Sequence, residues 1–225
     1  MATTISESES RSIAWRTNQL ATGAVALQLL VLQIRAATDS DREAIWNIFH
    51  EVVATGDTYV FDPNTSREEA LAYWFREDTH TYVAVKDSVG DAVSVPGKLT
   101  ASPTGQFQDR SASAALRRDE QVVGSYVLRP NRPGLGAHVS NASFIVATSA
   151  RGLGVGRAMG EHCLSEARRL GFRGMQFNFV VSTNESAVHL WQELGFKIVG
   201  TLPGAFRHSQ KGYVDVYVMF RSLID

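Results

Sequence analysis

Several features that would point to secretion, metal binding or a polyanionic partner are scarce or absent in this sequence. Cys163 is the single cysteine, so no disulfide framework can exist and a reducing compartment is expected. The six histidines have no spacing typical of metal ligands, and we predict no metal site. A net charge of -1 gives no electrostatic reason to expect nucleic acid or a membrane surface as a partner. We therefore expect a cytoplasmic protein, with a mitochondrial location left open.

The sequence also lacks an apolar run long enough to cross a bilayer. Leu20–Ile34 comes nearest, but it is short and two glutamines, Gln28 and Gln33, interrupt it. A signal peptide has an apolar segment of this length; however, glutamates precede this run and no small-residue cleavage site follows it. We predict that its second half, from about Leu27 to Ala36, is a buried first strand, and that residues 1–26 form an N-terminal arm.

What is present is the composition of a globular domain, with 225 residues, 44% of them hydrophobic and 20% charged. Thr38 and Asp39 can cap a helix that runs to about Thr55, and Ser66 with Glu69 forms a capping box for a second helix. Apolar periodicity then predicts strands at 81–86, 121–128, 139–147, 175–181, 197–200 and 213–220, and helices at 154–170 and 184–194. This order predicts an α/β (α+β) domain with a mixed sheet over residues 27–225.

Residues 87–120 differ from the rest of this domain. They are rich in serine, alanine, glycine, aspartate and arginine, and they show almost no periodic apolar pattern. We predict a flexible insertion between two strands that is dispensable for catalysis.

The stretch Arg151–Gly156, with the letters R-G-L-G-V-G, follows a predicted strand and opens a predicted helix. Glycines let the backbone approach a phosphate closely, and the free N–H groups at a helix start favour an anion there. Arg151 and Arg157 can add positive charge. Taken alone, the pattern also fits a dinucleotide turn or simple tight packing.

Two other phosphate-binding motifs are excluded by the sequence around this loop. A Rossmann turn follows the first strand and has an acidic residue about 20 positions later, but here that position falls at residues 174–176 with no acid. A P-loop needs a lysine and a serine or threonine after its last glycine, and these are absent.

A second block, Asn184–Phe196, has the pattern N-x-x-A-x-x-L-W-x-x-L-G-F and follows the next predicted strand. Together the two blocks resemble the GCN5-related N-acetyltransferases, the GNAT superfamily. The resemblance implies the GNAT fold, a mixed central sheet with flanking helices and a splayed parallel pair, here 139–147 and 175–181. It also implies acetyl-CoA as co-substrate, bound between these strands. The implied cofactor-binding residues are Phe144, Ile145, Val146, Arg151, Gly152, Leu153, Gly154, Val155, Gly156, Arg157 and Asn184.

A narrower resemblance is to the yeast acetyltransferases that act on azetidine-2-carboxylate and cis-4-hydroxyproline. The segments 55–59, 73–75, 123–131, 141–144 and 177–184 match that group in order and spacing. It implies substrate contacts by Asn141 and Asn178 and a homodimer, for which we expect the C-terminal strand 213–220 to offer an edge. Asp57 departs from the pattern, because the yeast enzymes have a lysine there.

Attack of an amine on a thioester needs positioning, an oxyanion donor and routes for protons. Backbone N–H groups around Phe144–Val146 are the expected donors. Many relatives place a glutamate base on this strand, whereas Asn141 cannot accept a proton at neutral pH. We therefore predict that Asn141 and Asn178 are the catalytic residues, that water accepts the proton, and that Phe144 and Tyr59 also contact the substrate. His138 could act as a base through water, although a lone histidine before a strand is more often incidental.

Three functions compete at this point. The chain could acetylate a small amino or imino acid, acetylate protein N-termini or lysines, or bind acyl-CoA without catalysis. The paired asparagines and the aromatic residues near the predicted site favour the first. No acidic run is available to hold a basic peptide, and the intact glycine loop argues against the third.

Overall fold

The computed structural model describes residues 12–14, 31–87 and 120–224. Most of the predicted N-terminal arm, 1–26, and nearly all of the predicted insertion, 87–120, lie outside the described residues, as do residues 27–30 of the predicted first strand. Within the described ranges, no helix is both long and apolar enough to cross a membrane.

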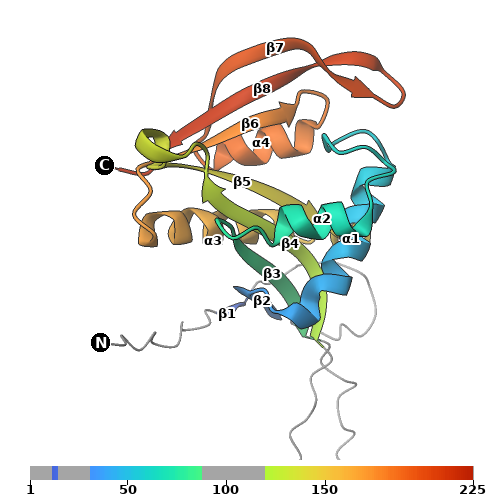
Figure 1. The fold of residues 1–225 in the computed structure, drawn as a ribbon, viewed down its shortest axis with the longest axis vertical. Helices are drawn as coiled ribbons and strands as arrows, with labels where there is room; N and C mark the ends of the chain where they lie inside the picture. The colour runs from blue at the N-terminus through green and yellow to red at the C-terminus, as the bar shows by residue number, and fades with distance from the viewer. Residues whose placement is uncertain (1–11, 15–30, 88–119, 225) are drawn as a thin grey trace, which may run out of the picture.

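The described chain alternates strands and helices in the order expected for a mixed α/β domain, which confirms the predicted fold class (Figure 1). The elements are β1 (Ser12–Ala14), β2 (Val31–Ala36), η1 (Asp39–Asp41), α1 (Arg42–Ala54), α2 (Arg67–Trp74), β3 (His80–Asp87), β4 (Glu120–Pro130), η2 (Gly134–Gly136), β5 (Val139–Val146), η3 (Thr148–Ala150), α3 (Val155–Arg169), β6 (Gly174–Val181), α4 (Glu185–Glu193), β7 (Lys197–His208) and β8 (Gly212–Ser222).

The strands form one sheet in the order β1-β2-β3-β4-β5-β6-β8-β7. Every neighbouring pair in this sheet is antiparallel except β5 and β6. These two parallel strands share two register pairs, Val139 with Gly174 and Ser140 with Met175, and no pair beyond them. The predicted splayed pair is therefore present, and it opens a gap in the middle of the sheet.

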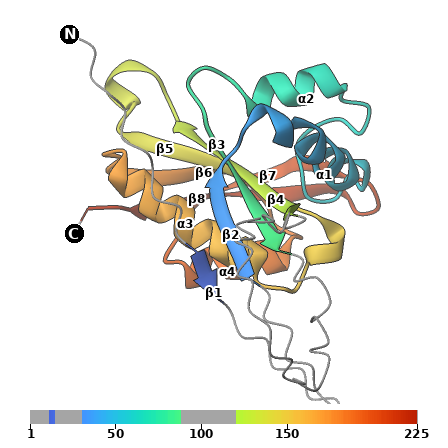
Figure 2. The same ribbon diagram turned by 90° about the horizontal axis from the view of Figure 1, so that it is seen from below.

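Helices cover both faces of the sheet, with α1 and α2 on one side and α3 and α4 on the other (Figures 1 and 2). Adjacent residues of β5 point to opposite faces. The hydroxyl of Ser143 lies 3.1 Å from that of Tyr73 on α2. The ring of Phe144 lies 4.8 Å, centroid to centroid, from that of Trp191 on α4. The gap between β5 and β6 thus has an α1/α2 side and an α3/α4 side.

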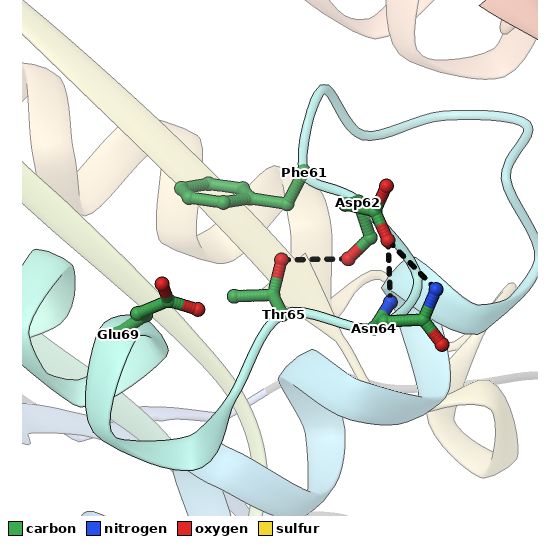
Figure 3. A pocket seen from close by; sticks show the side chains of 5 residues that line it. All are labelled: Phe61, Asp62, Asn64, Thr65 and Glu69. Atoms are coloured by element: carbon green, nitrogen blue, oxygen red, sulfur yellow. Dashed lines mark hydrogen bonds between the residues drawn. The ribbon is translucent and has the colours of Figure 1, made fainter.

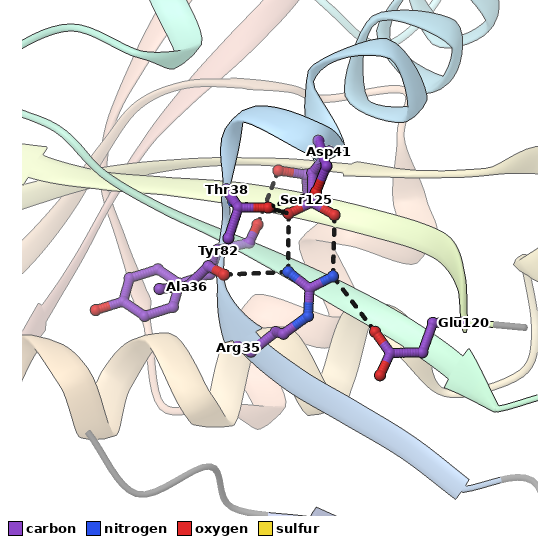
Figure 4. A network of polar contacts seen from close by, with 8 residues as sticks. Arg35, Ala36, Thr38, Asp41, Tyr82, Glu120 and Ser125 are labelled. Atoms are coloured by element: carbon purple, nitrogen blue, oxygen red, sulfur yellow. Dashed lines mark hydrogen bonds and ion pairs between the residues drawn. The ribbon is translucent and has the colours of Figure 1, made fainter. Parts of the chain in front are cut away.

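A partly buried ion pair fixes the start of α1 against β2 (Figure 4). Asp41 is only 4% exposed, and its carboxylate accepts hydrogen bonds from Arg35 at 2.8 and 3.0 Å. The backbone N–H of Thr38 donates to the same carboxylate at 2.7 Å. A buried carboxylate is tolerated only when it is paired in this way. Burial raises the pKa of Asp41, but the bonds from Arg35 and Thr38 outweigh it and the pKa is lowered.

Helix α2 is capped and anchored as its sequence predicts. The side chain of Ser66 accepts from the backbone N–H of Glu69 at 3.2 Å, and the Glu69 carboxylate accepts from the backbone N–H of Ser66 at 3.0 Å, which confirms the capping box. At the other end, the indole of Trp74, fully buried, donates to Ser125 on β4 at 2.9 Å. This anchor holds the neighbouring Tyr73 over the central sheet.

Three sequence predictions need correction. Residues Ser12–Ala14, expected in an irregular arm, pair with β2 as strand β1. Strand β7 continues to His208 instead of ending near Gly200, because a register shift between Leu202 and Phe206 accommodates Pro203, which has no N–H to donate. Strand β8, expected to offer a free edge, is paired on both sides, so the edge belongs to β7.

Candidate active site

The gap between β5 and β6 exposes backbone donors of β5. Ala147 donates to Val123 of β4, and Asn131 donates to Val139, so odd-numbered residues of β5 direct their N–H and C=O groups toward β4. The even-numbered residues Phe144 and Val146 therefore point theirs into the gap, where β6 has moved away. The prediction of donors at 144–146 was wrong for Ile145, whose N–H faces β4.

The glycine loop follows directly at the end of β5. Gly152 and Gly154 have φ values of +77° and +80°, in the left-handed region that side chains rarely adopt. Helix α3 then begins, and its first intrahelical bond runs from Ala158 to Gly154 at 3.0 Å. The N–H groups of residues 155–157 precede that bond and point out of the helix start. This arrangement suits an anion, as the sequence predicts.

The two arginines of the loop have different surroundings. Arg151 is exposed and lines the cleft described below. Arg157 forms an ion pair with Glu193 of α4, so its charge is already partly neutralised and it ties α3 to α4. Arg151 is therefore the better placed of the two to meet a phosphate.

Asn184 begins α4. Its side-chain oxygen accepts from the backbone N–H of Ala187 at 3.3 Å and from the hydroxyl of Ser186 at 3.1 Å. An asparagine amide also has two N–H donors. Asn184 can therefore cap the helix with its oxygen and donate to a ligand with its nitrogen.

A single cleft of about 620 Å³ joins the gap, the loop and the α1/α2 side of the sheet. Nearly all predicted site residues line it; Leu153, which is 39% exposed, does not. Those that do are Tyr59, Asn141, Phe144, Ile145, Val146, Arg151, Gly152, Gly154, Val155, Gly156, Arg157, Asn178 and Asn184.

The end of the cleft away from the loop is aromatic. The rings of Tyr59 and Phe61 stack with centroids 5.8 Å apart, and Phe61 packs edge-on against Tyr73 at 5.0 Å. Phe61 also borders a second hollow at the surface, beside Asp62 and Glu69 (Figure 3). The polar groups of that hollow bond to one another, as Thr65 and Asn64 do to Asp62, and nothing there is arranged for chemistry.

Gln176 on β6 connects the two predicted catalytic asparagines. The amide nitrogen of Asn141 donates to the Gln176 carbonyl at 2.8 Å, just beyond the last β5–β6 register pair. The side chain of Gln176 donates to Asn178 at 2.8 Å, and Asn178 donates to Asn131 at 2.6 Å. Asn178 sits in a bulge of β6, where two residues oppose one of β8. The structure thus brings Asn141 and Asn178 to one cleft and fixes both amides.

Sequence reasoning missed Arg129, Gln176 and the role of Asn131. Arg129 lines the cleft from β4, in register with Asn141 of β5. It was missed because a lone arginine near a strand end does not form part of a recognisable sequence motif.

Other reactive groups lie away from this cleft. His138 is exposed, and its ring Nδ1 lies 3.1 Å from the carbonyl of Leu135, outside the cleft lining. Cys163 is fully buried in α3, and burial raises its pKa. Among the residues that the structure describes, no cluster of three or more histidine, cysteine or acidic side chains could hold a metal ion.

Known proteins are similar to this chain in sequence and in fold. A model of the acetyltransferase (GNAT) family matches residues 94–196. N-acetyltransferase aca1 of Schizosaccharomyces pombe is 30% identical over 167 residues, which are 74% of this chain and 72% of that protein. A GCN5-related N-acetyltransferase structure from Kribbella flavida is 42% identical with a TM-score of 0.69, over 85% of this chain and 97% of that one.

The fold also matches yncA of Salmonella typhimurium, described as a putative acetyltransferase with its cofactor acetyl-CoA. That structure has a TM-score of 0.62 and 20% identity, over 86% of this chain and 95% of that one. The fold and the aca1 match define a GNAT acetyltransferase. The chain belongs to this family of acetyltransferases.

Gly156 offers a clean test of the loop. A Cβ built there would meet only Leu190, at an ordinary 3.5 Å, so the bulky variant Gly156→Leu is expected to fold. Its side chain would stand in the cleft, where a pyrophosphate must approach the backbone. We expect the Kd for acetyl-CoA, measured by calorimetry, to rise at least about tenfold, roughly 1.4 kcal/mol.

Gly200→Leu on β7 is the matched control, because its Cβ would also make only one ordinary contact, 3.9 Å from Val218. Gly154 is less suitable, since a side chain at φ +80° strains the loop itself. An unchanged Kd in folded Gly156→Leu protein would contradict the assignment of the loop.

Proposed function

We propose that this acetyltransferase transfers the acetyl group of acetyl-CoA to the amine of a small amino or imino acid, by direct attack within a ternary complex. The observation that carries the proposal is the aromatic lining of the cleft, to which Tyr59, Phe61 and Tyr73 contribute together with Asn141. This lining suits a small acceptor. A peptide acceptor needs an open groove that continues past the reacting amine.

The proposed reaction forms a carbon–nitrogen bond and breaks a carbon–sulfur bond. The amine nitrogen attacks the thioester carbonyl carbon, the carbonyl oxygen becomes negatively charged, and the carbon–sulfur bond then breaks. The N–H groups of Phe144 and Val146, which point into the gap, are the donors for that oxygen. No aspartate, glutamate or histidine is among the described residues that line the cleft. The amine proton therefore passes to water, and the departing thiolate takes a proton from solvent.

Asn141 and Asn178 are proposed to orient the acceptor. Each amide nitrogen has two hydrogens and gives one to a protein oxygen, Gln176 for Asn141 and Asn131 for Asn178. The second hydrogen of each can donate to a substrate. Because these protein bonds fix both amides before a substrate arrives, little conformational entropy is lost on binding.

The resemblance to enzymes of proline analogues supports an imino acid as acceptor. Its main departure, Asp57, does not line the cleft; its carboxylate accepts from the hydroxyl of Thr55 instead. The position that differs from the yeast enzymes thus lies outside the proposed acceptor site.

The substrate class is tested with a panel of acceptors, following release of free CoA. The panel contains azetidine-2-carboxylate, cis-4-hydroxyproline, primary amino acids, a polyamine, an aryl amine and a basic peptide. We expect the cyclic imino acids to give the highest kcat/KM. Preference for the peptide or the polyamine would overturn the proposed substrate class, and no CoA release with any acceptor would favour a binding protein.

Removal of each asparagine amide should have a distinct kinetic effect. A hydrogen bond to a charged group is worth about 1.5–3 kcal/mol, so Asn178→Ala should lower kcat/KM for the imino acid by roughly 10- to 150-fold. Asn141→Ala should lower kcat more than it raises KM, because its proposed role is in the tetrahedral state. Acetyl-CoA affinity should persist in both variants.

Asn64→Ala is the control for this pair, because Asn64 bonds to Asp62 outside the cleft. Asparagine variants that match this control in kcat and KM would show that neither amide contacts the acceptor.

We also propose a homodimer that pairs through the edge strand β7. Apolar side chains of the β7–β8 hairpin are unusually exposed, with Val199 at 60%, Leu202 at 43% and Tyr213 at 76%.

Light scattering should give twice the chain mass of 24.7 kDa, and Val199→Glu should shift the measured mass toward that of the monomer. Leu135→Glu, on the exposed turn η2, is the control. A monomer mass for the parent protein at high concentration would refute the dimer.

A further inference from the structure

We propose that Arg129 binds the carboxylate of the acceptor and makes this enzyme selective for amines that carry one. The inference rests on the proposed function and deepens it, because it assigns the acceptor's anionic group to one residue of the cleft.

Arg129 has an unused donor that is closed to water. Its Nη2 donates to the hydroxyl of Tyr73 at 3.1 Å, and the guanidinium carbon lies 4.5 Å from the centre of the Tyr73 ring. Its Nη1 is shielded from solvent and has no hydrogen-bond partner. A shielded donor without a partner costs free energy. A ligand oxygen in the cleft would satisfy it.

The charge of Arg129 is also unmatched. Among the described residues, none of the ion pairs includes Arg129, in contrast to Arg35 with Asp41 or Arg157 with Glu193. A guanidinium with one nitrogen shielded from water, as Nη1 of Arg129 is, is normally paired with an anion. The planar guanidinium is suited to a carboxylate in particular, because its donors match the two oxygens.

The position of the guanidinium fits an α-amino acid. Tyr73 connects it to the reacting centre: its hydroxyl accepts from Arg129 and lies 3.1 Å from the hydroxyl of Ser143, the residue before Phe144. The guanidinium therefore lies on the acceptor side of the gap, near the backbone donors expected for the thioester oxygen. In an α-amino or imino acid the carboxylate and the nitrogen are a bond or two apart, so one molecule can reach both.

Arg129 is too distant to serve the pyrophosphate of acetyl-CoA. It is in register with Asn141, whereas the glycine loop follows the end of β5 at Val146. That separation along the strand is roughly 17 Å at 3.3–3.4 Å per residue. The cleft thus has two cationic ends, one for each substrate.

Tyr59 provides a second donor at the same end. Its hydroxyl is shielded from solvent and makes no hydrogen bond of normal geometry. Burial raises the pKa of Tyr59, against the lowering influence of nearby Ser143 and Arg129, so the phenol stays protonated and able to donate. A carboxylate could accept from Arg129 with one oxygen and from Tyr59 with the other.

The test compares two acceptors in parent and variant enzymes: azetidine-2-carboxylate and its uncharged primary amide. The ratio of their kcat/KM values is the readout, because differences in amine reactivity cancel when the same pair is used throughout. In Arg129→Gln we expect this ratio to fall by roughly 10- to 150-fold. The loss should appear mainly in KM, since the contact exists in both ground and transition states.

Two further variants sharpen the comparison. Arg129→Lys keeps the charge but loses the planar pair of donors, so its ratio should lie between those of the parent and Arg129→Gln. Arg132→Gln removes the same charge from an exposed position outside the cleft, and its ratio should equal that of the parent. If Arg129 had only a structural role, its substitution would lower kcat/KM for both acceptors to the same extent, and the ratio would not change.

The outcomes separate the two proposals. If the parent acetylates the imino acid but Arg129→Gln leaves the ratio unchanged, the Arg129 inference is overturned and the proposed function stands. The same holds if the parent shows no preference for the carboxylate. If the parent acetylates neither acceptor, the proposed substrate class fails, and the inference that depends on it fails as well.

Discussion

The site depends on one constraint, which is that β5 and β6 pair at two positions and then separate. A parallel pair in the middle of a sheet normally continues for its whole length, with every N–H and C=O bonded. Here the ladder stops after Ser140 and Met175, and the even-numbered N–H groups of β5 are left facing a cleft. The unpaired N–H groups of β5, the cleft and its access from the α1/α2 side all follow from that separation.

Specific side chains hold the strands apart without leaving the sheet loose. Asn141 bridges to the Gln176 carbonyl just where the ladder ends, and the bulge at Asn178 turns β6 away from β5. On the opposite face, Phe144 and Phe177 pack on Trp191, so the gap has an apolar wall on the α4 side. Specific contacts therefore maintain the gap: polar hydrogen bonds on one face and packed aromatic rings on the other.

Much of this arrangement could be predicted from the sequence, because it depends on local patterns. The glycine loop and the two capped helices each have a signature in consecutive residues, whereas the splayed parallel pair was predicted only from the resemblance to the GNAT superfamily. Arg129 could not be found in this way, since its significance comes from lacking a partner in the folded protein. The amide direction at Ile145 depends on the register with β4, and the full length of β7 depends on a bulge that accommodates Pro203. Each of these is a property of pairing between distant segments.

The short β5–β6 ladder has a consequence for the energetics of the whole chain. The sheet consists of two halves, β1 to β5 and β6 with β8 and β7, which are joined only by the two register pairs of β5 and β6. A ligand that enters the gap takes the place of the missing strand contacts and bonds to the N–H groups that the sheet leaves open. Such a ligand binds the folded chain and not the unfolded one, so it adds RT ln(1 + [L]/Kd) to the stability of the fold. If acetyl-CoA occupies the gap as proposed, the resistance of this protein to unfolding is coupled to the supply of its own co-substrate.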